Sequence, residues 1–320
     1  MKSVTSPRRS VLVVAVAVVA AVACGSEDEI DGGGGAAAAA GGSGGGSVEP
    51  LGCADDIVWT AADSLAKARD HHATFGFEVG GTGYLFVAGG WNYKAVYKDV
   101  HVAVIGDDPF YVKWSAAGDM PSVRAGQAMA QLGSHVFLAG GQRPGALMDE
   151  VIVAQVQPQG SLSVWQQQAP LPGRRFHLSM VSAQGQLIAT GGLQESDFSA
   201  TASVYVATPQ DGVVTAWQTS TMPSPRSHHA SFVAGDYLYV SGGLTGSPSG
   251  KNTLLSDVWR APLLAGGGVG RWQPSVALPG ARLTHAAFVR GRCVYLAAGL
   301  VQPLAYSDQV LAAPFDEQGN

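Results

Sequence analysis

Five short elements of the sequence place a polar side chain three residues after an arginine, and these residues are the first candidates for chemistry. The arginines are Arg69, Arg124, Arg174, Arg226 and Arg282, and the residues that follow are His72, Gln127, His177, His229 and His285. A guanidinium offers paired donors that fit a carboxylate or phosphate, and a histidine can exchange a proton near neutral pH. Brought together, the five elements would form a ring suited to an anionic ligand.

The same recurrence has a second interpretation, because a residue repeated in every unit can serve the unit itself. Arginine and histidine can hydrogen-bond neighbouring units, and Gln127 in place of a histidine argues against a strict histidine chemistry. The adjacent pairs His71–His72 and His228–His229 do not predict a metal site, because neighbouring strand residues point to opposite faces. The sequence leaves ligand binding and structural support open, and it predicts neither a metal nor a cofactor.

The elements that position these residues form a repeat of roughly 52 residues. Gly-Gly closes an apolar run at Gly89, Gly140, Gly191 and Gly242, and Ala298-Gly299 is the fifth copy. A strand-like run then ends at Ala103, Ala154, Ala207, Ala261 and Ala312, and tryptophan recurs at Trp59, Trp114, Trp165, Trp217 and Trp272. Short apolar runs separated by turn residues at this period predict antiparallel strands arranged as propeller blades.

This pattern resembles the Kelch repeat, with Pro-Arg near the start, Gly-Gly ending the second strand and a tryptophan in the fourth strand. The resemblance covers Trp59 to the C-terminus. It implies an all-β, five-bladed Kelch-like β-propeller with four antiparallel strands per blade, although six or seven blades are usual in the family. Since Trp59 has no first three strands before it, we expect Ile57–Ala61 to supply the last blade's fourth strand and close the ring.

The N-terminal region predicts export. Lys2, Arg8 and Arg9 precede an apolar run over residues 11–23, which is too short for a membrane span and typical of a signal peptide. The run ends at Cys24 in a sequence that resembles a bacterial lipobox, which implies lipidation of Cys24; an ordinary secretory peptide is the alternative. We therefore expect a signal peptide over 1–23, a lipidated flexible tether over 24–48 and the propeller over 49–320.

Two further cysteines, Cys53 and Cys293, are candidates for a disulfide, because an exported chain meets oxidising conditions. The bond would join the residues before the closing strand to the blade that this strand completes. The alternative is that both are small buried apolar residues.

The loops after each Gly-Gly differ in length and composition while the strands repeat, as recognition loops on a rigid scaffold do. Strand direction places these loops and the arginines at the same mouth of the channel. The candidate ligand-binding residues among them are Trp91, Tyr93, Arg143, Glu195, Asp197, Phe198 and Lys251. Glu195 and Asp197 are close enough in sequence to act as a general acid and base.

The net charge of −5 gives no basic footprint, so we expect no nucleic-acid partner. Eukaryotic Kelch adaptors, which hold acidic peptides with arginines, and the bacterial sialic acid mutarotases are similar propellers. We expect an exported monomer, lipid-anchored to the bacterial cell envelope at the outer membrane, that binds a protein or carbohydrate, acidic ones included. A sialic acid mutarotase-like enzyme and a structural envelope module are the alternatives.

Overall fold

The structure is a computed structural model that describes residues 64–79, 82–92, 94–105, 113–194, 198–246, 252–301 and 305–316. These residues are almost entirely strands and turns, with one 3₁₀ turn, η1 (Pro158–Gly160). The predicted all-β class is therefore confirmed. Within the described ranges, no helix has the length and apolar character needed to cross a membrane.

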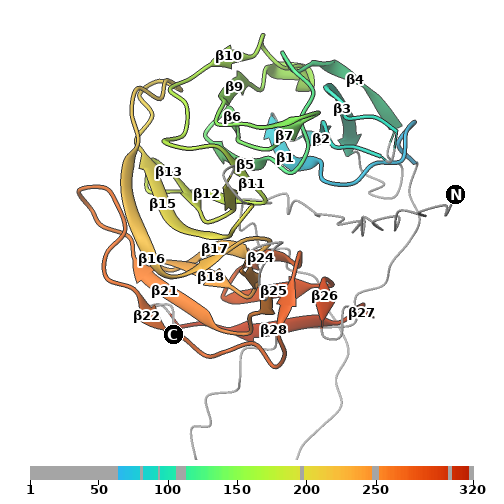
Figure 1. The fold of residues 1–320 in the computed structure, drawn as a ribbon. Helices are drawn as coiled ribbons and strands as arrows, with labels where there is room; N and C mark the ends of the chain where they lie inside the picture. Colours follow the sequence, from blue (N-terminus) through green and yellow to red (C-terminus); the bar gives the residue numbers. More distant parts are fainter. Residues whose placement is uncertain are drawn as a thin grey trace, which may run out of the picture.

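Five antiparallel sheets follow one another along the chain and form the successive blades of a propeller (Figure 1). Blades 1 and 2 consist of β1 (Ala73–Val79), β2 (Thr82–Ala88), β3 (Asp99–Ile105) and β4 (Lys113–Asp119), and of β5 (Ala128–Leu132), β6 (His135–Ala139), β9 (Val151–Gln155) and β10 (Gln166–Gln167). Blades 3 and 4 consist of β12 (Ser179–Ala183), β13 (Gln186–Thr190), β15 (Thr201–Ala207) and β16 (Gln218–Arg226), and of β17 (Ala230–Ala234), β18 (Tyr237–Ser241), β21 (Val258–Pro262) and β22 (Gln273–Pro274). In blade 5 the structure describes β24 (Ala286–Arg290), β25 (Cys293–Ala297) and β28 (Val310–Pro314).

Shorter strands lie at the end of the blades where each Gly-Gly is found. They are β7 (Gln142–Arg143), β8 (Ala146–Leu147), β11 (Arg175–Phe176), β14 (Leu193–Gln194), β19 (Leu244–Thr245), β20 (Thr253–Leu254), β23 (Arg282–Leu283), β26 (Leu300–Val301) and β27 (Ala305–Tyr306). These strands fix the loops that rim one mouth of the ring.

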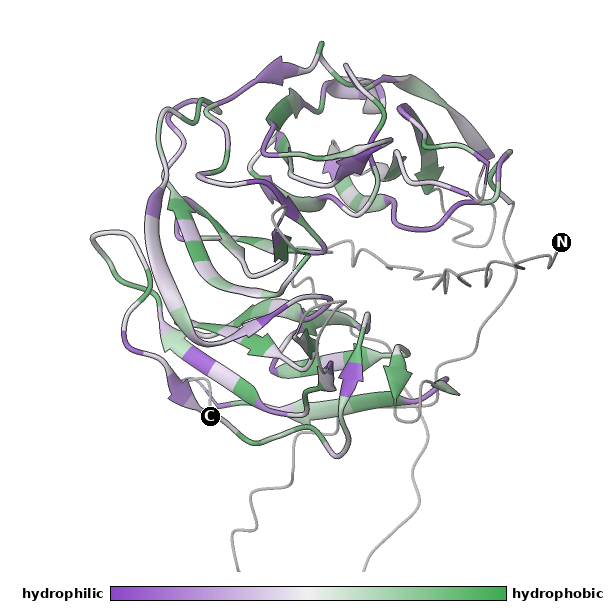
Figure 2. Cartoon of the chain, in the orientation of Figure 1, coloured by the Kyte–Doolittle hydropathy of each residue, from purple (hydrophilic) through white to green (hydrophobic). Residues whose placement is uncertain are grey.

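The second strands of blades 2 and 3 are strongly apolar, because each is covered on both faces by neighbouring blades. The strand β6 is HVFLA and β13 is QLIAT, and both are almost fully buried. β-Branched and aromatic side chains suit such strands. The outer strands β10 and β22 are exposed and hydrophilic, as Figure 2 shows at the rim of the ring.

Three apolar cores lie between consecutive blades, and each receives a tryptophan that directly precedes or begins an outer strand. Trp165 packs in the core between blades 1 and 2, Trp217 between blades 2 and 3, and Trp272 between blades 3 and 4. The repeated tryptophans thus join neighbouring blades by filling the space between them. A fourth core, between blades 4 and 5, contains no tryptophan among its described members.

The Gly-Gly pairs form the joint between blades. The second glycine donates its N–H to the carbonyl of the next blade's arginine, at 2.9 Å for Gly90 and Arg124 and 2.8 Å for Gly243 and Arg282. At Gly89, the first glycine of its pair, φ is +63°, and an added Cβ would lie 2.6 Å from the Arg124 carbonyl oxygen. Only glycine fits there, which explains why the pair recurs at this point of every unit that has a following blade in the chain.

The junction after blade 5 differs from the other four. Ala298, with φ 59°, replaces the first glycine. The inner strands β24 and β1 also lack the extensive contact that joins β5 to β12 and β17 to β24. The predicted closing strand, Ile57–Ala61, lies outside the described residues, so ring closure and the blade count stay predictions. Cys293 is disulfide-bonded, and its partner also lies outside the described residues.

Candidate functional site

The arginines of the repeat lie inside the blades rather than in the channel. The side chains of Arg69, Arg124 and Arg226 are fully buried. In the third unit the repeat position is occupied by Arg175, since Phe176 pairs with Leu193 as Ala125 pairs with Gln142. The predicted Arg174 is therefore one residue out of register. The spacing could have shown this, because sixteen residues separate Arg175 from Gly191, as they separate Arg124 from Gly140.

Each of these arginines binds the strand that follows its own Gly-Gly loop. Arg69 Nη1 lies 2.7 Å from Asp99 Oδ1, and the same nitrogen donates to the Gly89 carbonyl at 2.9 Å. Arg124 pairs with Glu150 at 3.0 Å and Arg226 with Asp257 at 2.9 Å. These pairs pin the Gly-Gly turn to the third strand, which favours the structural interpretation of the arginines.

The remaining two units use neutral partners for the same purpose. Arg175 donates to the Tyr205 hydroxyl at 2.6 Å, and Arg282 donates to Gln309 Oε1 at 3.0 Å. Acids at the start of the third strand are thus the arginine partners in three units, and neutral side chains take this role in the other two. In blade 5 this position belongs to Gln309, one residue after Asp308, and the strand reaches Pro314, beyond the predicted end at Ala312.

The residues three places after the arginines link each blade to the one before it. Gln127 donates to the Ala88 carbonyl at 3.0 Å. His229 Nε2 lies 2.8 Å from Thr190 Oγ1, and His285 Nε2 lies 2.9 Å from Ser241 Oγ. The register shift gives Leu178, not His177, this place in blade 3, and Leu178 packs in the same apolar core as Ala139.

The residues two places after the arginines form a second ring, nearer the axis. They are His71, Gly126, His177, His228 and Thr284, and all five have φ between 52° and 61°. Their backbones form a ladder from blade to blade, in which Gly126 N–H donates to the His71 carbonyl at 2.8 Å and Thr284 N–H to the His228 carbonyl at 2.7 Å. This left-handed turn precedes the first strand of each blade, so the strand alternation assumed for the His-His pairs does not apply to its residues.

Three histidine rings of this inner ring meet at the axis. The His177 and His228 rings stack with centroids 3.6 Å apart, and the His71 centroid lies 4.8 Å from that of His177. The Phe176 ring lies 3.7 Å from the His177 ring, and Trp91 Nε1 donates to His71 Nδ1 at 2.9 Å. Asp70 Oδ1 is also 2.9 Å from that nitrogen. The arrangement is a cluster of imidazole and aromatic rings at one channel mouth.

Burial keeps most of the channel histidines uncharged. It lowers the pKa of His177 well below the usual value, with a further contribution from the neighbouring His228. Burial and the nearby His71 lower the pKa of His228 to about 3, and burial lowers that of His72 to about 4. At neutral pH these side chains are therefore donors and acceptors without charge.

A pocket of about 170 Å³ opens over this cluster. All five blades contribute to its lining, which consists of His71, His72, Gly126, Gln127, His177, Leu178, His228, His229, Thr284 and His285. The described lining includes neither an arginine nor a carboxylate. Of the predicted residues, His72, His177, His229 and His285 are brought together here, whereas His71 and His228 were missed because sequence does not reveal a left-handed turn.

The described loop candidates, Trp91, Arg143 and Phe198, follow the Gly-Gly turns of blades 1, 2 and 3. Trp91 pairs with Asp70 and Val96 and its indole reaches the histidine cluster, whereas Arg143 is half-exposed and pairs with Glu150 at 3.4 Å. Phe198 is exposed. The remaining candidates, Tyr93, Glu195, Asp197 and Lys251, and the lipidation and disulfide candidates Cys24 and Cys53 lie outside the described residues. In the described part of the chain, no group of three or more His, Cys, Asp or Glu residues is arranged to hold a metal ion.

Comparison with known proteins agrees with this fold. No family model matches the chain. Beta-scruin of Limulus polyphemus is 22% identical over 261 residues, which are 76% of this chain and 26% of that protein, so the chain spans about a quarter of this relative. A solved structure, described as the structure of YjhT, superimposes with a TM-score of 0.65 and 14% identity over 81% of this chain and 85% of that one. The chain is a Kelch-type β-propeller.

Proposed function

We propose that this protein is an exported, membrane-anchored binding protein that recognises a ligand at the histidine-lined mouth of its propeller channel. One observation carries the proposal: all five blades contribute to one open pocket, and three histidine rings and two aromatic side chains meet beside it. The buried arginines, which fix each Gly-Gly turn to the third strand of its own blade, do not line the pocket. The lining residues contact neighbouring blades and also face the pocket, where their side chains are available to a ligand.

The chemistry of the pocket favours a neutral carbohydrate. The pocket volume of about 170 Å³ would accommodate one sugar ring. Uncharged imidazoles can both donate and accept hydrogen bonds, as sugar hydroxyls require, and Leu178 adds an apolar side chain to the lining. An acidic ligand is less well supported, because the guanidiniums that suggested it are already paired inside the blades.

Recognition is better supported than turnover. A mutarotase-like reaction needs a proton carrier beside the ligand. Burial holds His177 and His228 neutral, and the carboxylate next to the lining, Asp70, is 2.9 Å from His71 Nδ1 and does not itself line the pocket. A structural envelope module would need no open pocket at this mouth.

The test is binding of a panel of neutral and acidic glycans and of peptides to the full mature chain, measured by calorimetry. His228→Asn keeps a side chain that tolerates positive φ while removing the ring, and it should weaken binding at least tenfold. His135→Asn, at the far end of blade 2, is the matched control and should bind as the parent does. Equal binding by both variants would place the site elsewhere, peptide binding alone would indicate a protein ligand, and no binding by the parent would favour the structural module.

A further inference from the structure

The position that directly follows the repeat arginine carries a buried acid in blade 1. This position pairs with the residue after each Gly-Gly, and in the five blades it is occupied by Asp70, Ala125, Phe176, Ser227 and Leu283. The variety shows that the blade needs no particular side chain there. Asp70 is nevertheless only 6% exposed. Burying a carboxylate costs stability unless it is hydrogen-bonded, so this acid calls for a partner.

The side-chain partner of Asp70 is the next residue, His71, which lines the histidine pocket. Asp70 Oδ1 lies 2.9 Å from His71 Nδ1. A carboxylate accepts hydrogen bonds and donates none, so this contact requires a hydrogen on Nδ1. In the neutral ring, the other nitrogen, Nε2, is then an acceptor.

The Trp91 indole competes for the same nitrogen. Its Nε1 lies 2.9 Å from His71 Nδ1 and carries a hydrogen of its own, so the two contacts require opposite tautomers. The contact with the carboxylate is charge-assisted, and such hydrogen bonds are roughly twice as strong as neutral ones. A bare Nδ1 would in addition set its lone pair against the carboxylate. Asp70 therefore decides the tautomer of His71.

The Nε2 atom of His71 remains for a ligand. It has no hydrogen-bond partner among the residues that the structure describes, and the side chain is 12% exposed. The other two rings of the cluster are engaged differently. His177 and His228 stack on each other at 3.6 Å, and burial lowers both pKa values. His71 is thus the ring in which a fixed tautomer and access to the pocket coincide.

We propose that Asp70 is a positioning residue of the histidine-lined mouth, which holds His71 in the tautomer that offers Nε2 to the ligand as an acceptor. The proposal rests on the binding function proposed above and narrows it. The ligand must donate a hydrogen at this point, as a sugar hydroxyl does, whereas an ether oxygen or an ionised carboxylate has none to donate. This disfavours acidic ligands on a second ground, independent of the paired arginines.

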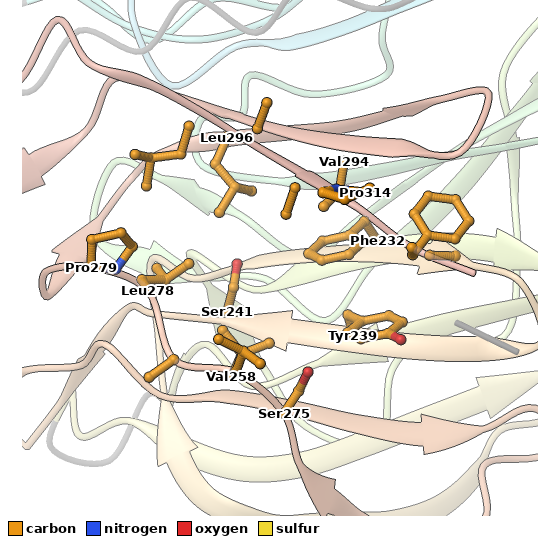
Figure 3. Close-up of a pocket in the computed structure, with 17 residues that line it drawn as sticks. Phe232, Tyr239, Ser241, Val258, Ser275, Leu278, Pro279, Val294, Leu296 and Pro314 are labelled. Carbon is orange, nitrogen blue, oxygen red and sulfur yellow. The ribbon is translucent and has the colours of Figure 1, made fainter. Parts of the chain in front are cut away.

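A second pocket, of about 370 Å³, opens between blades 4 and 5 and differs in chemistry (Figure 3). Leu278, Val294 and Leu296 belong to its largely apolar lining, and Ser275 is among its polar side chains. The described lining of this pocket contains neither an imidazole nor a carboxylate. It is therefore the comparison site for sugar binding.

Imidazole nitrogen NMR of the full mature chain tests the tautomer without any ligand. Protonated and bare ring nitrogens resonate far apart, and the His71 signals are assigned by their loss in His71→Asn. At pH 8 the parent should carry the His71 proton on Nδ1. Asp70→Ala, which places in blade 1 the residue found at this position in blade 2, leaves only the Trp91 donor at Nδ1, so the proton should move to Nε2. A proton on Nε2 in the parent would overturn the proposal.

Trp91→Phe covers the case in which Asp70→Ala does not fold. It removes the competing donor and keeps the carboxylate, so His71 should keep its proton on Nδ1. A proton on Nε2 in this variant would show that Asp70 does not hold the tautomer.

Calorimetry with D-glucose, D-galactose and D-mannose, and with their deoxyfluoro analogues, tests the consequence for binding. Fluorine in place of a hydroxyl removes the donor hydrogen, so one such analogue should bind the parent about tenfold more weakly than its sugar, the effect of one lost hydrogen bond. Asp70→Ala should weaken binding of that sugar by a similar factor and bind both forms alike. Asp236→Ala, in an exposed turn of blade 4, and Ser275→Ala, in the second pocket, should bind as the parent does.

The outcomes separate this proposal from the function on which it rests. If sugars bind and Asp70→Ala binds them as the parent does, the positioning role is wrong and the binding function stands. A loss of binding in Ser275→Ala alone would move the sugar to the second pocket and overturn the role of His71. If none of the three sugars binds the parent, the carbohydrate function fails, and the acceptor role of His71 fails with it even where NMR places the proton on Nδ1.

Discussion

At the scale of single residues, the repeated arginines and histidines divide into a supporting set and an accessible set. Arg226 is enclosed between the Gly242 carbonyl at 3.0 Å and Asp257 at 2.9 Å, so its charge is used within the blade. His228, two residues later, stacks on His177 beside the channel pocket. Two positions of one motif thus differ in environment: Arg226 is enclosed within its blade, and His228 lines the pocket at which we propose binding.

Replacing Arg226 with alanine should destabilise the protein without changing the site. The change removes the donor to the Gly242 carbonyl and one of the two donors to Asp257, the other being the Trp259 indole, and it also empties the space of a fully buried side chain. We expect a cost of about 3 kcal/mol. Urea unfolding measures the cost, and Arg143→Ala, whose side chain is half-exposed, should cost less than about 0.5 kcal/mol. If Arg226→Ala abolished ligand binding while keeping the parent's stability, the arginine would be a ligand contact.

The buried histidines predict a loss of stability in mild acid. Their pKa values are lowered on folding, so the unfolded chain binds more protons, and stability falls as pH drops below about 6.5. For His228 the fall continues to about pH 3, where the folded side chain also protonates. Urea unfolding at pH 7, 6 and 5 gives the free energy of unfolding at each pH. This free energy should fall less steeply with decreasing pH for His228→Asn than for the parent. Identical slopes would mean that these histidines protonate freely in the folded state.

At the scale of the blade, the Gly-Gly joint is the element on which neighbouring sheets depend. Gly140 has φ +64°, and a Cβ there would lie 2.6 Å from the Arg175 carbonyl. Gly133, in a turn of the same blade, has φ +57° with nothing within 4 Å of its Cβ position. The two glycines have similar φ values, but only Gly140 is closely approached by the next blade.

This pair separates conformational strain from interference at the joint. Gly133→Ala should cost about 1 kcal/mol, the usual penalty for alanine at positive φ. Gly140→Ala adds the clash with Arg175 and should cost about 3 kcal/mol in all. Thermal unfolding of both variants gives the comparison. Equal losses would show that the joint yields easily and that the neighbouring carbonyl does not restrict it.

The elements were predictable from sequence because their signals are local and repeat five times. Apolar runs, Gly-Gly and tryptophan gave the strands and their order. The register was harder, since Arg174 and Arg175 are adjacent and only the sixteen-residue spacing to Gly191 distinguishes them. The inner histidine ring was out of reach, because the positive φ of His71, His177 and His228 arises from the blade-to-blade hydrogen bonds of the assembled ring.

At the scale of the whole molecule, the proposed lipid anchor and the proposed binding mouth would be joined by one chain segment. Lipidation at Cys24 would hold the chain to the envelope, and a segment of roughly 24 residues rich in Gly, Ala and Ser, with a few acids, would give an average reach of about 25–30 Å. The histidine-lined mouth of the propeller would then be presented to solvent at that distance from the envelope.

The anchor can be tested separately from the propeller. In a bacterial host that exports and lipidates such proteins, the parent should fractionate with membranes and incorporate radiolabelled palmitate. Cys24→Ser should do neither, yet its purified propeller should unfold at the parent's Tm, because Cys24 precedes the flexible tether and adds nothing to the blades. Palmitate labelling of Cys24→Ser would place the lipid elsewhere. A lower Tm would show that Cys24, not Cys53, is the disulfide partner of Cys293, because its loss would then remove that bond.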